Sequence, residues 1–420
     1  MAMNNYFVLD SLNIIFLAVL LLVTIGVVIY QGKKPFKYNL VFFLFFVAMV
    51  GAISSNHLGL TWVFIEATSL ASAYLILQSN TEYSLEATWK YLFLCSIGIS
   101  LAFVGIILLL IASNTVNSLF YNNLYANATV MEPFWLKLSY VFILIGFGTK
   151  VGLAPVHFWL PDAHAEAPSP VSAMLSATLL NSAFIVILRY TKLMELAGLG
   201  DFARILLLTM GILSVFITAV YVFKIANYKR MLAYSSIENM GIIAIGTASG
   251  GVGLFAAILH LIAHSLIKSS FFMTAGNILH IFKTKEVLCV QGLIETDPRT
   301  GWLWVCCGLL ILGVPPSPMF FNKFLIIKQL FIDKHYIIAG LFLFLIIVVA
   351  YGIIRAVIKM SFSPRHCKTE SVGSAINTPS IQLPIRNYLP QIGLLLIILV
   401  LGFYIPTWLY QLIEGAMKCI

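Results

Sequence analysis

Long apolar runs follow one another along most of this chain and limit the environment in which it can fold. A bilayer core about 30 Å thick requires about 20 mostly apolar residues in each helix, and the alternation typical of a membrane β-barrel is absent. Because 60% of the residues are hydrophobic and 10% are charged, the sequence predicts an all-α polytopic membrane protein with about 12 transmembrane helices. The predicted spans lie near residues 12–30, 38–55, 58–79, 89–112, 135–154, 168–191, 203–223, 229–248, 252–280, 301–330, 337–361 and 388–414.

Lys and Arg residues gather in alternate loops between these spans. The segments "QGKKPFK", "NYKR", "FKTKEV" to "DPRT" and "PRHCK" fall on one side of the membrane, whereas residues 113–134 and 248–251 contain no Lys or Arg. The positive-inside rule therefore places both termini outside, and we expect the cytoplasmic membrane of a prokaryote. Arg189, Lys192 and Arg204 flank an outside loop, and we interpret them as interfacial side chains whose charged ends reach water. Since no polybasic block is present, nucleic acid is not an expected partner.

The sequence contains no pattern expected of a resident cofactor. Its six cysteines include the adjacent Cys306 and Cys307 but no CxxC motif, whereas iron–sulfur clusters and structural zinc sites need clustered thiolates. Dinucleotide-binding, P-loop and nucleophile-elbow motifs are also absent. We therefore expect no cofactor in this chain and no catalysis by the chain alone. Asp162, His164 and Glu166 match metal ligands by type, but their spacing between prolines favours a surface turn.

Ionisable residues lie inside several apolar runs, where each charge costs at least about 2.5–3.5 kcal/mol at the bilayer centre. His260, His264 and Lys268 follow one another at intervals of four residues, which places them along one slowly drifting face of a helix. Charges of this kind need partners or water inside the protein, and we predict that they form a proton path. The other members of the set are Glu66, Lys150 and Lys323.

Each of these residues also has a structural alternative at the level of sequence. Glu66 suits an ion pair with a lysine, and Lys268 and Lys323 suit side chains that snorkel from helix ends. His264 taken alone suits an interhelical hydrogen bond. The Ser and Thr residues of "ATSLASA" are expected to pack helices together rather than bind a ligand.

Two of the apolar spans are interrupted by Gly and Pro. Lys150 precedes "VGLAP", and Lys323 follows "PPSPMFFN". Broken helices in both halves of a chain indicate inverted-topology repeats. Glu238 then takes the position in the second repeat that Glu66 takes in the first. The predicted divisions are an N-terminal transmembrane helix at 1–37, inverted repeats at 38–192 and 203–361, and a linker with a C-terminal transmembrane helix at 362–420.

Four segments of the sequence resemble one known family. They are "IEATSLASAYLI", "TKVGLAPVHFWLPDAHAEAPSPVSAMLSATLLN", "YKRMLAYSSIENMG" and "HLIAHSLIKSSFFMTAGN". These segments resemble the antiporter-like subunits of respiratory complex I. They are most similar to the branch formed by the F-type membrane component of hydrogenase-4, which belongs to membrane-bound hydrogenase and formate hydrogenlyase complexes. The resemblance covers roughly residues 55–330, and the "LPDAHAEAPSPVSA" segment is highly specific to it.

The resemblance implies a proton channel built of two inverted repeats and driven by redox chemistry in other subunits. By motif, Glu66 is the glutamate of a glutamate–lysine pair, Lys150 is its lysine, and Lys323 holds the terminal charged position. The central path matches His260, His264 and Lys268. Nickel–iron and iron–sulfur centres are implied for partner subunits, and protons are implied as the transported ion, with sodium as an alternative. The accessory positions that we predict are Asn181, Lys229, Glu238, His157 and His164.

The sequence departs from the family pattern at several positions. Asn181 stands where distant relatives carry Lys or His, Asn227 replaces an Asp, and Asn239 replaces a His. Lys323 stands where many members have Glu, so the position stays ionisable with the opposite sign. Two N-terminal spans and a long lateral C-terminal helix of the relatives have no counterpart in this sequence.

The expected function is therefore a proton-translocating, antiporter-like membrane subunit of a redox-driven complex. Three alternatives stay open at this point: the proton-channel subunit of an inorganic-carbon uptake complex, a subunit of a multisubunit cation/proton antiporter, and a structural spacer without conduction. In the mechanism that we hypothesise, Glu66 holds Lys150 protonated until a change in a neighbouring subunit weakens the pair. Lys150 then passes its proton towards His264 and Lys268, because breaking an ion pair lowers the proton affinity of a buried lysine.

Overall fold

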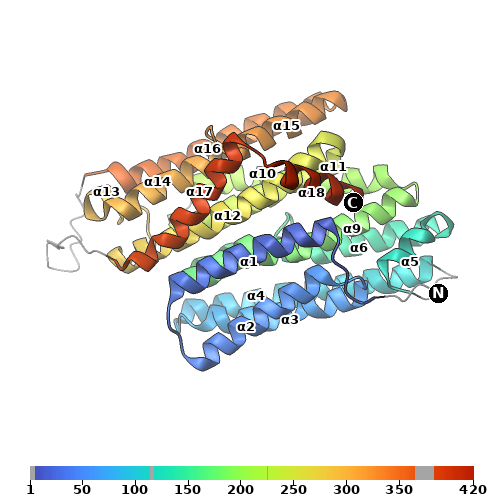
Figure 1. Ribbon diagram of the computed structural model, residues 1–420, viewed down its shortest axis with the longest axis horizontal. Coiled ribbons are helices and arrows are strands. Elements are labelled where there is room, and N and C mark those ends of the chain that lie inside the picture. Colours follow the sequence, from blue (N-terminus) through green and yellow to red (C-terminus); the bar gives the residue numbers. More distant parts are fainter. Residues whose placement is uncertain (1–4, 114–117, 225, 365–382) are drawn as a thin grey trace.

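Helices run side by side along the long axis of the molecule (Figure 1). This computed structural model describes residues 5–113, 118–224, 226–364 and 383–420, so part of the predicted linker, with most of "PRHCK", lies outside the described residues. The described residues are almost entirely helical, and the all-α class is confirmed. The helices are α1 (Ser11–Gln31), α2 (Phe36–Ser54), α3 (Leu58–Leu77), α4 (Glu82–Ala112), α5 (Tyr121–Ala126), η1 (Ala128–Val130), α6 (Pro133–Val151), α7 (Trp159–Glu166), α8 (Ser169–Met174), η2 (Leu175–Leu179), α9 (Leu180–Leu196), α10 (Gly200–Tyr221), η3 (Val222–Lys224), α11 (Tyr228–Ser249), α12 (Gly251–Phe282), α13 (Leu293–Thr296), α14 (Pro298–Leu312), α15 (Pro318–Ile332), α16 (Tyr336–Phe362), η4 (Ile385–Asn387), α17 (Leu389–Phe403) and α18 (Thr407–Lys418).

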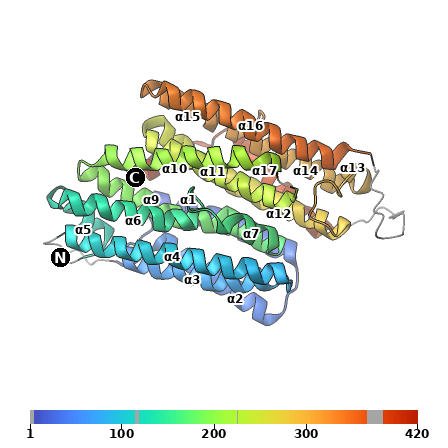
Figure 2. The same ribbon diagram turned by 180° about the vertical axis from the view of Figure 1, so that it is seen from behind.

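Within the described residues, 10 helices are long and apolar enough to cross a membrane. The predicted spans at 229–248 and 301–330 are not among them, so the count of twelve is not confirmed. The second of these spans is divided into α14 and α15, each 15 residues long. The first corresponds to α11, which carries Lys229, Glu238 and other polar side chains. α11 still runs along the bundle beside α10 and α12 (Figure 2). Its polar side chains do not face lipid, because neighbouring helices bury nearly all of them.

The 32-residue helix α12 lies between the two parts of the bundle. It contacts α1 and α8 on one side and α14, α15 and α17 on the other. In Figure 1 it is the yellow helix between the blue-to-teal and the orange-to-red helices. His260, His264 and Lys268 are all buried along it. The predicted polar stripe therefore runs through the protein interior and does not face lipid.

Small residues allow α4 and α6 to pack at close range. A Cβ atom at Gly146 of α6 would lie 2.6 Å from the Cβ of Ala102 and 2.6 Å from the backbone oxygen of Gly98. Helices in lipid associate through small residues of this kind, because close backbone approach increases the van der Waals contact between them. One to two turns further along, the same packing brings Tyr91 of α4 to Lys150 of α6.

The first helix break follows α6 directly. α6 ends at Val151 because Gly152 adopts a left-handed conformation with φ 76°, which favours glycine. One of the carbonyls freed at this end, that of Thr149, accepts a hydrogen bond of 2.6 Å from the indole of Trp159. Lys150 lies in the last turn, where the negative end of the helix dipole stabilises a cation. The first predicted break is therefore present.

The second break separates α14 from α15. α14 ends before Gly313, which has φ 85°, and Ser317 is the N-cap residue of α15. The Ser317 hydroxyl also donates to the Leu310 carbonyl at 2.8 Å, which holds the two helix ends together. α17 lies against this loop so closely that a Cβ atom at Gly402 would collide with the backbone oxygen of Pro316. Glycine at position 402 is therefore required for the contact.

Arg189 of α9 is buried, with 5% of its surface exposed, so its interpretation as an interfacial side chain is wrong. Its guanidinium donates hydrogen bonds to the Ser55 carbonyl at 2.8 Å, to Asn13 Oδ1 at 2.7 Å and to Asp10 Oδ2 at 3.1 Å. The five N–H groups of arginine suit several acceptors at once. Arg189 thereby joins α9 to the start of α1 and to the loop between α2 and α3, and this network keeps its charge inside the protein.

We expect Arg189→Met to lower the stability of the purified protein by about 2–3 kcal/mol, because charge-assisted hydrogen bonds are lost and their acceptors stay buried. Thermal unfolding in mild detergent measures the change. Arg230→Met is the matched control, because Arg230 pairs with Asp162 and is about half exposed; exposed pairs contribute about 0–1 kcal/mol. Equal decreases in melting temperature for the two variants would contradict a structural role specific to Arg189.

Candidate functional site

Lys150 lies at the α4–α6 contact with no surface exposed. Its ammonium nitrogen donates a hydrogen bond of 3.2 Å to the Tyr91 hydroxyl and lies 4.8 Å from the centroid of the same ring. A cation close to an aromatic ring is attracted by the negative face of the ring. An ammonium group has three N–H donors, and this hydrogen bond uses one of them. Tyr91 therefore holds the buried Lys150 ammonium through both a hydrogen bond and its ring.

Glu66 lies in the middle of α3 and is partly buried. Its carboxylate accepts hydrogen bonds from the Ser69 hydroxyl at 3.1 Å and from the Ser96 hydroxyl of α4 at 3.3 Å. Among the ion pairs of the described residues, none joins Glu66 to Lys150 within 4 Å. The two predicted partners thus share one helix cluster without direct contact.

Hydroxyl groups fill the space between the two charges. The Tyr91 and Ser72 hydroxyls are 2.6 Å apart, and either can donate. Ser72 also donates to the Ser69 carbonyl at 3.2 Å, and the Ser69 side chain bonds Glu66. Hydroxyls both donate and accept hydrogen bonds, so Tyr91 and Ser72 can exchange donor and acceptor roles. Together they connect Lys150 to α3, and the Ser69 carbonyl, which only accepts, lies between Ser72 and the Ser69 hydroxyl that bonds Glu66.

The second half contains a direct ion pair. Lys323 Nζ of α15 lies 3.7 Å from Glu238 Oε1 of α11, and the two side chains are 8% and 3% exposed. Lys323 also donates to the Leu312 carbonyl at 3.3 Å, at the end of α14. A carbonyl freed by the helix break thus becomes part of a charged site. Glu238, predicted as an accessory residue, is the partner of the terminal lysine.

Along α12 the three predicted residues differ in their partners. His260 Nε2 lies 2.9 Å from Asn239 Oδ1 of α11. Lys268 Nζ donates to the Leu232 carbonyl of α11 at 2.7 Å. His264 lies between them, and neither of its ring nitrogens has a partner among the described residues. All three side chains have no exposed surface.

The accessory residues Asn181 and Lys229 lie on either side of this line. Asn181 Nδ2 donates to the Ser265 hydroxyl of α12 at 2.7 Å, which joins α9 to the central helix. Lys229 is buried and donates to the Ala167 carbonyl just after α7. Both side chains therefore bond to polar groups inside the protein, near the α12 residues, and do not face lipid.

The segment with Asp162, His164 and Glu166 forms helix α7, so the predicted surface turn is wrong. Pro161 lies in the first turn of α7, where backbone N–H groups have no partner inside the helix. The three side chains diverge. Asp162 pairs with Arg230, Glu166 pairs with Lys285 at 2.7 Å, and His164 is buried.

The two accessory histidines near α7 are both held by aromatic rings. The His164 ring stacks on Phe272 of α12, with centroids 5.1 Å apart, and both of its nitrogens lack a partner among the described residues. The His157 ring stacks on Phe158 at 4.8 Å. His164 therefore joins α7 to the central helix, whereas His157 stays in the loop after α6.

Tyr91 and the serines around it were not predicted from the sequence. Ser69 and Ser72 belong to "ATSLASA", which was interpreted as helix packing, and Tyr91 opens an otherwise apolar run. Neutral hydroxyls in a membrane helix usually bond to their own backbone, as Ser72 also does with the Thr68 carbonyl at 2.6 Å. Their position beside two charges depends on how α3 and α4 pack, and this is visible only in the structure.

The sequence of this chain matches a known protein family. A family model described as "NADH:quinone oxidoreductase/Mrp antiporter, TM" matches residues 55–349. This chain belongs to that family. It is an antiporter-like membrane subunit and an integral membrane protein, and the resemblance stated from its motifs is confirmed.

Two relatives and two solved structures illustrate the breadth of this family. The chain is 34% identical to a hydrogenase-4 component F homolog from Methylacidiphilum infernorum, over 99% of this chain and 88% of the relative. It is 25% identical to the D-type subunit of an Na(+)/H(+) antiporter from Alkalihalophilus pseudofirmus, over 91% and 76% of the two chains. Its fold matches a chain of an archaeal membrane-bound sulfane sulfur reductase with a TM-score of 0.88 and 25% identity, over 98% and 82% of the chains. It also matches a chain of the Mrp complex from Dietzia with a TM-score of 0.85 at 18% identity, over 98% and 84%, which shows the shared fold alone.

These similar structures are chains of multisubunit complexes, and other membrane subunits are therefore expected beside this antiporter-like subunit. The partly buried position of Glu66 suits a surface that a neighbouring subunit covers. The relatives and similar structures include a hydrogenase-4 component homolog and a chain of respiratory complex I.

Proposed function

We propose that this antiporter-like subunit carries protons through the membrane interior, driven by redox chemistry in partner subunits that hold the nickel–iron and iron–sulfur centres. One observation carries the proposal: buried ionisable side chains occur on α6, along the middle of α12 from His260 to Lys268, and in the ion pair between α11 and α15. Soluble or purely structural helices have no need of so many buried charges, each of which is costly in lipid. The hydrogenase-4 relative supports the redox class of complex.

The proposed path begins at Lys150 and ends at Lys323. Lys268, His264 and His260 occupy successive turns of α12, each about 6 Å further along the helix axis. A proton moves directly over about 3 Å, so one water between neighbours would complete each step. His260 then leads to Asn239 and to the adjoining ion pair of Glu238 with Lys323. We place the inverted repeats at 38–192 and 203–361, so that Glu66 and Lys150 belong to the first repeat and Glu238, Lys268 and Lys323 to the second.

Buried polar atoms without protein partners support a hydrated path. Buried polar groups in native proteins are nearly always paired, with protein or with ordered water. Among the described residues, the unpaired buried atoms include ring nitrogens of His164, His260 and His264, the amide oxygen of Asn181 and the hydroxyls of Ser235 and Ser269. These atoms belong to α7, α9, α11 and α12, the helices around the proposed path. We infer that ordered water joins them.

We propose that the chain lies in the cytoplasmic membrane with both termini outside, because positively charged loops favour the cytoplasmic side. In Figure 1 the described parts of both termini lie at one end of the bundle, and the Lys192 ammonium donates to the Lys418 carbonyl at 2.7 Å there. The turn between α1 and α2, with "QGKKPFK", lies at the opposite end. The termini and this basic loop therefore lie at opposite ends of the bundle, as the proposed orientation requires.

The identity of the partner subunits tests the driving reaction. The native complex is purified in mild detergent, and its subunits are identified by mass spectrometry. A nickel–iron hydrogenase large subunit with small iron–sulfur proteins is the expected result. A zinc protein of the carbonic-anhydrase type would instead assign the chain to inorganic-carbon uptake, and transport that requires sodium would assign it to cation/proton antiport.

We expect Tyr91→Phe to slow proton translocation by about tenfold, because the hydroxyl that joins Lys150 to Ser72 is lost while the ring remains. The rate is measured with a pH-sensitive dye in liposomes that contain the intact complex. Tyr140→Phe is the matched control. Tyr140 is also buried, but its hydroxyl bonds Thr191 and the Ala203 carbonyl, away from the proposed path. Equal rates for the two variants would remove Tyr91 from the path.

A further inference from the structure

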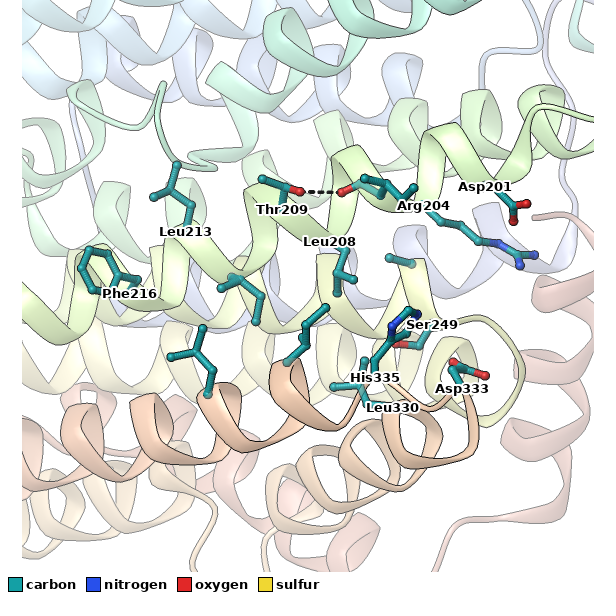
Figure 3. Close-up of a pocket in the computed structure, with 15 residues that line it drawn as sticks. Asp201, Arg204, Leu208, Thr209, Leu213, Phe216, Ser249, Leu330, Asp333 and His335 are labelled. Carbon is teal, nitrogen blue, oxygen red and sulfur yellow. Dashed lines mark hydrogen bonds between the residues drawn. The ribbon is translucent and has the colours of Figure 1, made fainter.

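A groove of about 890 Å³ lies between α10, the end of α11 and the helices α15 and α16 (Figure 3). Pockets of this size hold drug-sized ligands. α10 supplies much of the lining, and α16 supplies Ile338 and Leu341. None of the residues on the proposed proton path lines the groove, so its occupant does not depend on proton transport.

The two ends of the groove differ in chemistry. Asp201, Arg204 and Asp333 gather at one end, whereas Leu213 and Phe216 lie at the other (Figure 3). The distance along α10 from the charged end to Phe216 is about four turns, or roughly 22 Å. Half of the hydrocarbon core is about 15 Å thick. The groove therefore extends from headgroup level through one leaflet of the membrane.

We propose that this groove binds one phospholipid, with an acyl chain along α10 and a zwitterionic headgroup that carries a primary ammonium. The apolar wall alone would accept any acyl chain. The charged end selects the headgroup, because charged groups at a binding site discriminate between partners more strongly than apolar area does.

The charges at the headgroup end favour a zwitterion. Asp201 and Asp333 supply two carboxylates, and Arg204 supplies a guanidinium that also pairs with Glu195 at 2.8 Å. A guanidinium suits a phosphate group, and the carboxylates suit an ammonium group that can donate hydrogen bonds. An anionic lipid would also bring a phosphate for Arg204, but it has no ammonium group for the carboxylates of Asp201 and Asp333.

The kind of ammonium follows from the aromatic residues. A quaternary ammonium, as in choline, is recognised by a cage of aromatic rings. The Phe, Tyr and Trp lining of this groove consists of Phe216 among the described residues, and Phe216 lies at the end remote from the carboxylates (Figure 3). A primary ammonium, as in phosphatidylethanolamine, therefore fits the charged end better.

Photo-crosslinking tests this site in the intact complex. The complex is placed in lipid nanodiscs that contain a phosphatidylethanolamine with a diazirine in its acyl chain, and the labelled peptides are identified after illumination. We expect labels on α10 and α16. In the double variant Asp201→Asn and Asp333→Asn, the labelling of these helices falls by about fivefold, as expected for the loss of exposed ion pairs.

Three controls separate this lipid from other occupants. Glu132→Gln changes an exposed carboxylate outside the groove and should leave the labelling unchanged. Leu208→Trp narrows the apolar part of the groove and should decrease the labelling while the complex still assembles. Equal labelling by a phosphatidylglycerol analogue, full labelling of the double variant, or labels on a neighbouring subunit in place of α10 and α16 would each overturn the proposal.

Discussion

Replacing Lys150 with alanine is expected to abolish proton translocation by the intact complex while leaving its assembly intact. Lys150 is the buried cation at the first helix break, and its hydrogen-bond partner is Tyr91. Alanine removes both the charge and the proton carrier. Loss of a positioned acid–base group costs about 10²–10⁴-fold in a proton-transfer step. Dye-based measurement of proton uptake by liposomes that contain the complex records the loss, and gel filtration checks assembly.

Lys150→Arg distinguishes a proton carrier from a fixed charge. A guanidinium keeps the positive charge but does not release its proton in proteins, so we expect this variant to be as inactive as the alanine variant. Lys137→Ala is the matched control on the same helix, because Lys137 is partly exposed and its ammonium lies over the Phe202 ring. Activity in Lys150→Arg close to that of the unmodified complex would mean that Lys150 acts by electrostatics and not by proton transfer.

The ion pair between Glu238 and Lys323 is expected to be needed for both stability and proton translocation. Glu238→Ala leaves the Lys323 ammonium buried without its carboxylate partner. Breaking a buried pair on one side costs about 3–5 kcal/mol, so we expect a lower melting temperature in detergent together with loss of proton translocation. The carbonyl of Leu312, at 3.3 Å, is too weak a partner to replace a carboxylate.

The double variant Glu238→Met with Lys323→Met separates stability from transport. Apolar side chains of similar volume often replace a buried ion pair without loss of stability, so the melting temperature should return close to that of the unmodified protein. Proton translocation should stay absent, because both ionisable groups of the Glu238–Lys323 pair are then missing from the end of the proposed path. Translocation restored along with stability would show that the pair is structural.

Much of the fold was predictable because lipid demands long apolar helices. The two breaks were visible in "VGLAP" and "PPSP", since glycine and proline interrupt helices for local reasons. The number of spans was less predictable: α11 is polar and is stable only because α10 and α12 cover it. Helix α7 was also missed, because Pro161 stands in the first turn, where proline is tolerated.

At the site, residue types were predictable but partnerships were not. Charges stand out in apolar runs, and so the burial of Lys150, Lys323 and the α12 residues could be predicted from sequence alone. Which carboxylate meets which lysine depends on helix packing. The structure joins Lys323 to Glu238 and places hydroxyls between Lys150 and Glu66. No periodicity in the sequence specifies either arrangement.

Glycine at position 402 couples the position of α17 to the second helix break. A single added methyl group there would collide with the backbone oxygen of Pro316, in the loop that leads to Lys323. Mutations in these two distant stretches of sequence are therefore not independent. The helix α17 therefore does more than span the membrane, because its close approach at Gly402 also fixes the loop that leads to the charged site.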